Sequence, residues 1–498
     1  MNRAELRQAR AALAAFLLGA ATVLGFAPVA LAALPVLTAA GLLWLWEHAD
    51  TPARAAALGF AFGLGLFLAG VSWVYISLHD YGAMPAALAA AATLLFCAFL
   101  ALYPALVGYA QARLAGPVAL RRLLLIPALW ALTEWLRGWI FTGFPWLAFG
   151  YSQADSPLRG YAPVAGVFGL SWLVWLCAGL LLALPRRKGR GLALAALVLI
   201  LGLGFGLERV EWTRAQGTPF SVSLLQGNIA QDLKWDAARF AATVQEYRSM
   251  TARSAARLTI LPETAIPRFF DLLEPELVRS LAMGARSHGG DLIVGVPLRD
   301  GPGRYYNSAI SLGASPVQRY DKIHLVPFGE FIPPGFGWVP SVLKIPLADF
   351  SRGGAAQAPL ALAGQKIAVD ICYEDAFGEE IIRALPEATL LVNVSNVAWF
   401  GDSLAPHQHL QISQMRALET GRFMLRATNT GMTAIIDHHG NVAAVLPAFT
   451  EGALDGSAQG RSGATPYVRW GNAPLVLLAA FACALFALRY RKFAARSQ

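Results

Sequence analysis

Charged side chains are scarce in this 498-residue sequence. They make up 14% of its residues, whereas hydrophobic residues make up 56%. An ordinary soluble protein carries about 25% charged residues, so this composition excludes a wholly soluble chain. The sequence instead favours a membrane protein.

Cysteine is equally scarce, with four residues in the chain. Cys97, Cys177 and Cys483 fall within long apolar runs, which leaves Cys372 as the only cysteine of the more polar region 218–466. A disulfide within that region is therefore excluded. A lone buried cysteine commonly serves as a small hydrophobic side chain, so its surroundings must decide whether Cys372 does more.

Long apolar runs, by contrast, are abundant. A helix needs about 20 residues to cross a bilayer, and eight runs approach or exceed that length: 11–27, 29–47, 56–78, 85–112, 119–139, 163–184, 191–209 and 471–490. We therefore predict eight transmembrane helices. The first run could alternatively be a cleaved signal peptide, but the later spans argue against that reading.

Basic residues gather at alternate ends of the spans, as the positive-inside rule expects of cytoplasmic loops. They are Arg3, Arg7, Arg10, Arg54, Arg113, Arg121, Arg122, Arg186, Arg187, Lys188, Arg190, Arg489, Arg491, Lys492 and Arg496. The rule predicts that both termini are cytoplasmic and that the region after the seventh span is exported. This bias explains the net charge of +9 without a nucleic-acid partner.

Three segments follow from this topology. Residues 1–217 are predicted to form a membrane domain of seven helices, 218–466 an exported domain, and 467–498 an eighth helix with a basic tail. In the first segment, Gly59, Gly63 and Gly70 indicate close helix packing in lipid.

The exported segment has the pattern of an α/β domain with buried sheets. Strands are predicted at 220–228, 258–263, 291–298, 307–313, 366–374 and 389–396, and helices at about 236–255, 275–288 and 405–420. A later pair of runs with a His-Gly-Asn turn at 439–441 predicts a hairpin. The stretch 326–342, dense in Gly, Pro and aromatics, is predicted as either a rigid surface loop or a lid that dips into lipid.

Three polar residues follow predicted strands: Glu263 in "LTILPE", Lys322 in "RYDKIHL" and Cys372 in "VDICYED". A cysteine thiol has a pKa near 8.5 and must become a thiolate before it attacks. Glu263 can take its proton, and Lys322 can stabilise the thiolate and the oxyanion on the attacked carbonyl. Together the three residues predict nucleophilic acyl chemistry.

The same motifs carry a resemblance to a known family. In order, "LPET", "DKIHLVPFGE" and "ICYED" resemble the glutamate, lysine and cysteine motifs of the nitrilase superfamily. With spans on both sides, the chain is similar to the membrane-embedded branch of that superfamily, the apolipoprotein N-acyltransferases. Further matches are "QGNIAQDLKW" at 226–235, "NVSN" with "WFGDS" at 393–403, and "PHQHLQISQMRALETGR" at 406–422.

The resemblance implies an α-β-β-α sandwich carried by an eight-helix membrane domain. It also implies that Glu263 is the general base, Lys322 the charge stabiliser and Cys372 the nucleophile. The further site residues that it implies are Glu330, Tyr373, Glu374 and, near the substrate, Trp235. Val397, where the family usually has aspartate, and Thr430, where asparagine is common, depart from the pattern.

The activity implied is that of a bacterial inner-membrane acyltransferase with a periplasmic catalytic domain. A phospholipid would donate an acyl chain to Cys372 as a thioester, in a ping-pong reaction. The acceptor would be the α-amino group of the N-terminal S-diacylglyceryl-cysteine of an apolipoprotein, in the final step of lipoprotein maturation. We expect a monomer without cofactor or metal.

Other readings remain open. A membrane-tethered amidase or nitrilase would pass the acyl group to water, and a lipid transporter or binding protein would have lost catalysis. Charges within spans would favour a transporter, yet few occur beyond Glu134 and Arg137. His407 and His409 have a spacing that could bind metal, but a satisfied pair at a helix start is favoured.

Overall fold

The computed structural model describes residues 3–114, 116–338 and 349–494 of the chain. The chain forms two compact units. The first comprises Met1–Tyr75, Ala87–Val210 and Arg469–Gln498, and the second comprises Ile76–Ala86 and Glu211–Val468.

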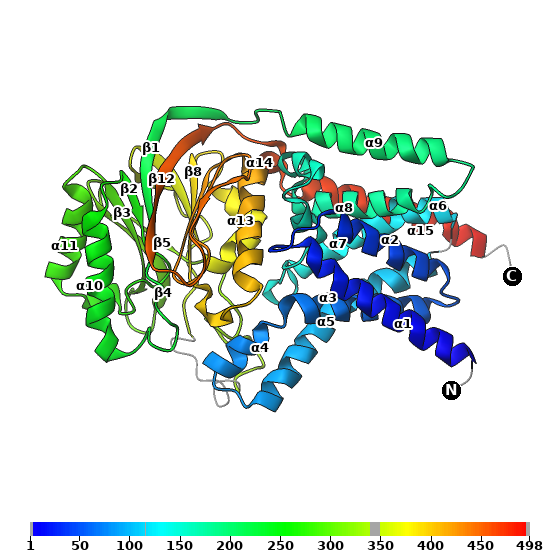
Figure 1. The fold of residues 1–498 in the computed structure, drawn as a ribbon, viewed down its shortest axis with the longest axis horizontal. Coiled ribbons are helices and arrows are strands. Elements are labelled where there is room, and N and C mark those ends of the chain that lie inside the picture. Colours follow the sequence, from blue (N-terminus) through cyan, green and yellow to red (C-terminus); the bar gives the residue numbers. More distant parts are fainter. Residues whose placement is uncertain (1–2, 115, 339–348, 495–498) are drawn as a thin grey trace. The chain divides into compact units, whose positions relative to one another are not determined.

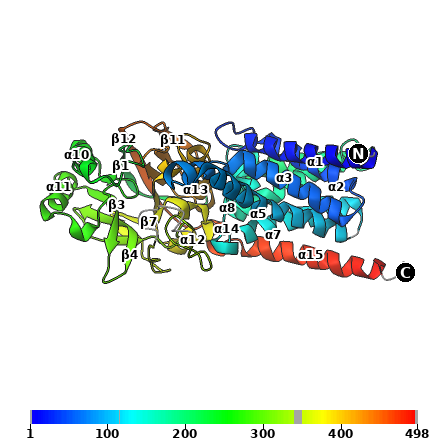
Figure 2. The ribbon, with the colours of Figure 1, turned by 90° about the horizontal axis from the view of Figure 1, so that it is seen from below.

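The first unit consists of helices. They are α1 (Arg3–Thr22), α2 (Ala33–Glu47), α3 (Pro52–Val71), α4 (Val74–Ile76), α5 (Ala86–Arg113), α6 (Val118–Leu120), α7 (Ile126–Arg137), α8 (Ala162–Leu181), α9 (Arg190–Leu207) and α15 (Ala473–Ala494). The long helices α1, α3 and α5 run alongside one another (Figures 1 and 2). This arrangement agrees with the predicted membrane character of the unit.

Within the described residues, five helices are long and apolar enough to cross a membrane: Glu5–Gly25, Pro52–Val71, Ala86–Arg113, Pro157–Leu181 and Arg190–Leu207. The predicted spans 29–47 and 471–490 carry the shorter apolar helices Ala33–Glu47 and Ala473–Arg489. In the predicted span 119–139, a π-helical turn at Arg121–Leu125 separates α6 from α7. Several apolar helices are thus confirmed, whereas the count of eight stays a prediction.

Glycines allow close helix contacts in this unit. A Cβ on Gly59 would lie 2.3 Å from the Pro104 oxygen, and one on Gly63 would lie 2.8 Å from the Ala101 Cα. A side chain at either position would therefore push α3 away from α5. The packing role predicted for these glycines is confirmed.

Two charged residues of α7 have local structural partners. Glu134 Oε1 accepts hydrogen bonds from Trp130 Nε1 at 2.8 Å and from the Phe149 N–H at 3.0 Å. Arg137 donates to the carbonyl oxygens of Phe144 and Trp146, both at 2.6 Å. These residues fasten the loop after α7, which is a sufficient reason for their presence among apolar helices.

The second unit is built on two six-stranded sheets. The first has the order β12 (Gly452–Ser462), β1 (Arg214–Gln226), β2 (Leu258–Ile260), β3 (Asp291–Arg299), β4 (Tyr305–Gly313) and β5 (Arg319–Asp321). The second has the order β11 (Val442–Val445), β10 (Ala434–Ile436), β9 (Met424–Thr428), β8 (Leu390–Ser395), β7 (Gln365–Ile371) and β6 (Leu360–Leu362). In each sheet, parallel pairs lie in the centre and antiparallel pairs lie at the edges.

The two sheets pack face to face. Val222 and Ile293 of the first sheet share one apolar core with Val369 and Val392 of the second. Helices α10 (Ala237–Arg253) and α11 (Pro275–Arg286) cover the outer face of the first sheet, and α12 (Gly378–Ile381), α13 (Ala405–Thr420) and α14 (Pro466–Trp470) pack on the second (Figure 1). The layers therefore follow the predicted α-β-β-α order.

Sequence patterns predicted most strands of the second unit, but missed some strands and one segment. The strand predicted at 366–374 ends at Ile371, because the backbone turns at Cys372 into a 3₁₀ turn, Cys372–Ala376. Strands β6 and β12 were not predicted. Residues 76–86, which comprise the gap 79–84 between two predicted spans and the adjoining ends of both, belong to the second unit, where the Tyr81 ring meets the edge of Trp399 at 6.1 Å.

Candidate active site

The structure brings together the predicted glutamate and lysine. Glu263 follows β2 and Lys322 follows β5, and Lys322 Nζ lies 3.5 Å from Glu263 Oε1. The Asn307 amide donates to Glu263 Oε1 at 2.7 Å, and the Asn396 N–H donates to Glu263 Oε2 at 2.8 Å. Both carboxylate oxygens are thereby fixed, and the ion pair has a defined orientation.

Glu330 completes this ion pair on its other side. Lys322 Nζ lies 2.9 Å from both carboxylate oxygens of Glu330, and the Val326 N–H donates to Glu330 Oε2 at 2.8 Å. Only 1% of Lys322 is exposed. Burial alone would lower its pKa, but Glu330 and Glu263 outweigh burial and raise it, so Lys322 remains an ammonium ion at neutral pH.

Cys372 stands at the end of β7 in a conformation that few residues adopt. Its φ of 56° is left-handed, which is uncommon and strained for a side chain other than glycine. The residue is 9% exposed. Burial, aided by the charge of Glu263, raises the pKa of its thiol to about 12, and Lys322 opposes the shift. At rest it is a thiol and needs a base to attack.

Hydrogen bonds from the second sheet and from α13 hold this strained backbone. The carbonyl oxygen of Cys372 lies 3.1 Å from Asn393 Nδ2 and 3.2 Å from His409 Nε2. The same His409 nitrogen lies 2.7 Å from Asp375 Oδ1, and Arg426 donates to Asn393 Oδ1 at 2.6 Å. Because both neighbours of Nε2 are acceptors, that nitrogen carries the proton.

Glu374 joins the segment after Lys322 to the turn Cys372–Ala376. Its Oε1 accepts from the N–H groups of Ile323 and His324, at 2.7 and 2.9 Å, and its Oε2 accepts from Ile371 N–H at 2.7 Å and Tyr320 Oη at 3.0 Å. Burial raises the pKa of Glu374 to about 7, although these backbone hydrogen bonds oppose the shift. Glu374 thus sets the distance between two segments of the site.

The other predicted residues have simpler surroundings. The Tyr373 ring is buried and lies edge-on to His324 at 5.7 Å and to Phe377 at 5.0 Å. Trp235 is half-buried in the segment between β1 and α10. Val397 is buried, and a Cβ on Gly431 would lie 2.4 Å from its Cγ2, so Val397 fills space beside the site. Thr430 is also buried.

Sequence reasoning missed several residues of the site. Asn307 and Asn396 orient Glu263, and Asn393 and His409 hold the Cys372 carbonyl. Lys234, also missed, is 4% exposed, and its Nζ donates to the Glu263 carbonyl oxygen at 3.1 Å. A lysine flanked by Leu233 and Trp235 was the available signal for the last of these.

A metal ligand is one interpretation of the spacing of His407 and His409. His409 is occupied by Asp375 and the Cys372 carbonyl, which fits the favoured interpretation of a satisfied histidine. Elsewhere among the described residues, only Glu211, His438 and His439 are grouped as a cation would require. Arg461 already lies 2.5 Å from Glu211, and its charge would repel a cation there.

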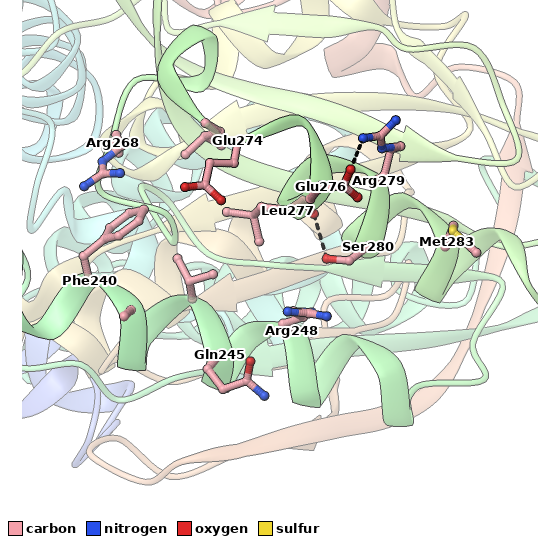
Figure 3. Close-up of a pocket in the computed structure, with 13 residues that line it drawn as sticks. Phe240, Gln245, Arg248, Arg268, Glu274, Glu276, Leu277, Arg279, Ser280 and Met283 are labelled. Carbon is pink, nitrogen blue, oxygen red and sulfur yellow. Dashed lines mark hydrogen bonds and ion pairs between the residues drawn. The ribbon is translucent and has the colours of Figure 1, made fainter.

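A separate pocket of about 560 Å³ lies between α10 and α11 (Figure 3). Phe240 and Leu277 form part of its wall, and the Arg268 guanidinium lies 3.8 Å from the centre of the Phe240 ring. None of the predicted site residues lines this pocket. The candidate active site is instead the buried cluster around Cys372.

Comparisons with known proteins agree with these motifs. Residues 18–180 match the apolipoprotein N-acyltransferase N-terminal domain, and residues 221–467 match the carbon-nitrogen hydrolase family. The apolipoprotein N-acyltransferase of Nitrosomonas europaea is 54% identical over 92% of this chain and 93% of its own, and that of Methylococcus capsulatus is 48% identical over 95% of each. An amidase from Nesterenkonia sp. covers 52% of this chain and 96% of its own, with 20% identity and a TM-score of 0.38.

Proposed function

This chain belongs to the apolipoprotein N-acyltransferase family, and on that premise we propose that it transfers an acyl chain from a membrane phospholipid to an apolipoprotein. The chain is an acyltransferase that acts in the N-acylation of lipoproteins. The acceptor is the α-amino group of an N-terminal S-diacylglyceryl-cysteine. The observation that carries the proposal is the Glu263–Lys322 ion pair beside a cysteine on a strained turn.

In the first half-reaction, Cys372 Sγ attacks the ester carbonyl of the phospholipid, and Glu263 takes the thiol proton. Lys322 stabilises the negative charge that develops on the carbonyl oxygen. The bond between the acyl carbon and the glycerol oxygen then breaks. Glu263 returns the proton to that oxygen, so a lysophospholipid leaves and a thioester remains on Cys372.

In the second half-reaction, the acceptor amine attacks the thioester carbon. An α-amino group has a pKa near 8, so part of it is neutral at neutral pH, and Glu263 takes the proton that it loses on attack. The carbon–sulfur bond breaks, the amide forms, and Glu263 returns the proton to Cys372 Sγ. These steps need only side chains of this chain, and a monomer is sufficient.

The proposed setting is the bacterial inner membrane. Five long apolar helices in the part of the chain that the structure describes support membrane insertion, and the alternation of basic residues supports eight spans with cytoplasmic termini. In this topology the second unit lies in the periplasm. Trp235 and Tyr373 are then proposed to contact substrate. Glu330 and Glu374 are proposed to support the catalytic triad, which consists of Glu263, Lys322 and Cys372.

A transfer assay tests this function against its rivals. Purified protein is incubated with phospholipid and a diacylated lipopeptide, and the peptide mass is measured. We expect one added acyl chain on a peptide with a free amino terminus and none on an amino-blocked peptide. Release of free fatty acid with no peptide acylation would favour the hydrolase, and no acyl release from any phospholipid would favour the binding protein.

A further inference from the structure

Lys234 is a buried lysine that the triad does not include. It lies in the segment between β1 and α10, and its Nζ donates to the main-chain carbonyl of Glu263 at 3.1 Å. Among the described residues, no carboxylate forms an ion pair with it. Burying an ammonium group without a counter-ion costs free energy. We therefore expect a role of Lys234 that offsets this cost in the charges around it.

The segment that carries Lys234 is fixed to the site at other points. Gln231 Oε1 accepts from the Asn396 side chain at 2.8 Å, and the Asn396 N–H donates to the Glu263 carboxylate. Thr264, directly after Glu263, has a left-handed φ of 48°. Lys234 therefore binds the backbone at a strained turn, where a small movement would redirect the Glu263 carboxylate.

The charges of the site explain why a second cation is useful. Lys322 contacts two carboxylates, Glu263 and Glu330, so these three groups alone carry a net negative charge that disfavours a thiolate. A protonated Lys234 balances that charge. The balance is kept when the proton moves from Cys372 to Glu263, because a neutral thiol and a carboxylate become a thiolate and a neutral acid.

Further charged groups follow the strands of the second sheet or pack on it, and Glu374 among them is about half ionised at pH 7, because its pKa is about 7. Those near the thiol are Asp370, Glu374, Asp375, His409 and Arg426. Arg426 is paired with Asp375 at 3.2 Å, and burial first, then Asp375, raises the pKa of Asp370 and keeps it neutral. Burial lowers the pKa of Lys234 to about 8, while Glu263 and Cys372 raise it, so Lys234 is largely protonated at pH 7.

We propose that Lys234 is a positioning residue of this site, whose ammonium group holds the Glu263 backbone and supplies the positive charge that favours the Cys372 thiolate. The inference rests on the proposed role of Cys372 as nucleophile. The interaction free energy between the two groups is shared, so the Lys234 ammonium stabilises the thiolate as much as the thiolate stabilises the ammonium.

The test is the rate at which iodoacetamide alkylates Cys372, followed by peptide mass from pH 7 to pH 9. Lys234→Gln keeps a hydrogen-bond donor but removes the charge, Lys234→Met removes both, and Lys234→Arg keeps both. Lys366→Met, at an exposed lysine of β7, is the matched control. Where the thiolate is the minor form, each unit of rise in the thiol pKa slows alkylation about tenfold.

We expect Lys234→Gln and Lys234→Met to slow alkylation about tenfold or more at pH 7, and less at pH 9, because Lys234, with a pKa of about 8, is mostly neutral there in the unmodified chain. Lys234→Arg and Lys366→Met should react like the unmodified chain at pH 7. If Lys234→Met does not fold, Lys234→Gln still provides the test. Alkylation of Lys234→Gln at the unmodified rate would overturn the proposal. If phospholipid never acylates Cys372 in the unmodified chain, the proposed function fails instead, and the alkylation rates still report the charge effect.

Discussion

At the scale of the residue, Glu263 is the group on which both half-reactions depend. Glu263→Gln keeps the shape of the side chain and removes the base, so we expect turnover to fall about a hundredfold or more. Glu274→Gln, at the rim of the separate pocket, is the control and should react normally. Unchanged turnover in Glu263→Gln would reduce Glu263 to a structural residue.

Glu374 should make stability depend on pH. Burial raises its pKa from 4.5 to about 7 in the folded protein, so the folded state holds this proton where the unfolded state has lost it. The resulting stability is present below about pH 4.5 and is lost as the pH rises through about 7, by up to about 3 kcal/mol.

Thermal unfolding in detergent between pH 4.5 and pH 8 measures this dependence. Glu374→Gln cannot titrate, so the stability difference between it and the unmodified chain should shrink as the pH rises. Parallel stability curves for the two proteins across this range would contradict the assigned pKa.

At the scale of the element, the aromatic stretch 326–342 keeps its two interpretations, rigid loop or lid. Phe336 is 43% exposed and Trp338 61% exposed, and the Phe336 ring lies edge-on to Phe328 at 5.3 Å. Residues 339–342 of this stretch lie outside the described residues.

Exposed aromatic side chains suit a bilayer surface, so we expect Phe336→Ala and Trp338→Ala to slow acylation from membrane phospholipid several-fold. Acylation from a soluble activated ester should change less. Initial rates with the two donors decide the point, and equal losses with both would identify the stretch as structural.

Helix contact in the first unit gives a second test at this scale. A Cβ on Gly65 of α3 would lie 2.0 Å from the Phe16 carbonyl oxygen of α1, whereas one on Gly202 of α9 meets nothing within 4 Å. We expect Gly65→Ala to destabilise the protein by about 1–3 kcal/mol and Gly202→Ala to leave the thermal midpoint unchanged. Equal midpoints would mean that α1 and α3 are not tightly packed.

At the scale of the whole molecule, sequence patterns predicted the features that depend on residues close together in the chain. Apolar length predicted the membrane helices, strand and helix patterns predicted an α/β domain with buried sheets, and reactive side chains after strands predicted Glu263, Lys322 and Cys372. The α-β-β-α layers were implied by the family resemblance. Asn307 and Asn396 were not predicted, because neither a side-chain amide on a strand nor a main-chain N–H after one has a distinctive pattern until folding places it beside Glu263. The membership of residues 76–86 in the second unit depends on distant contacts in the same way.

The central claim is that an acyl chain passes through a thioester on Cys372, and the intact mass of the protein after incubation with phospholipid alone tests it most directly. A buried site should exclude water and let the thioester persist until an amine arrives. We predict protein heavier by one acyl chain, with the added mass removed by hydroxylamine and absent in Cys372→Ala. Acylation that persists in Cys372→Ala, or an unmodified chain that never gains the acyl mass, would contradict the account.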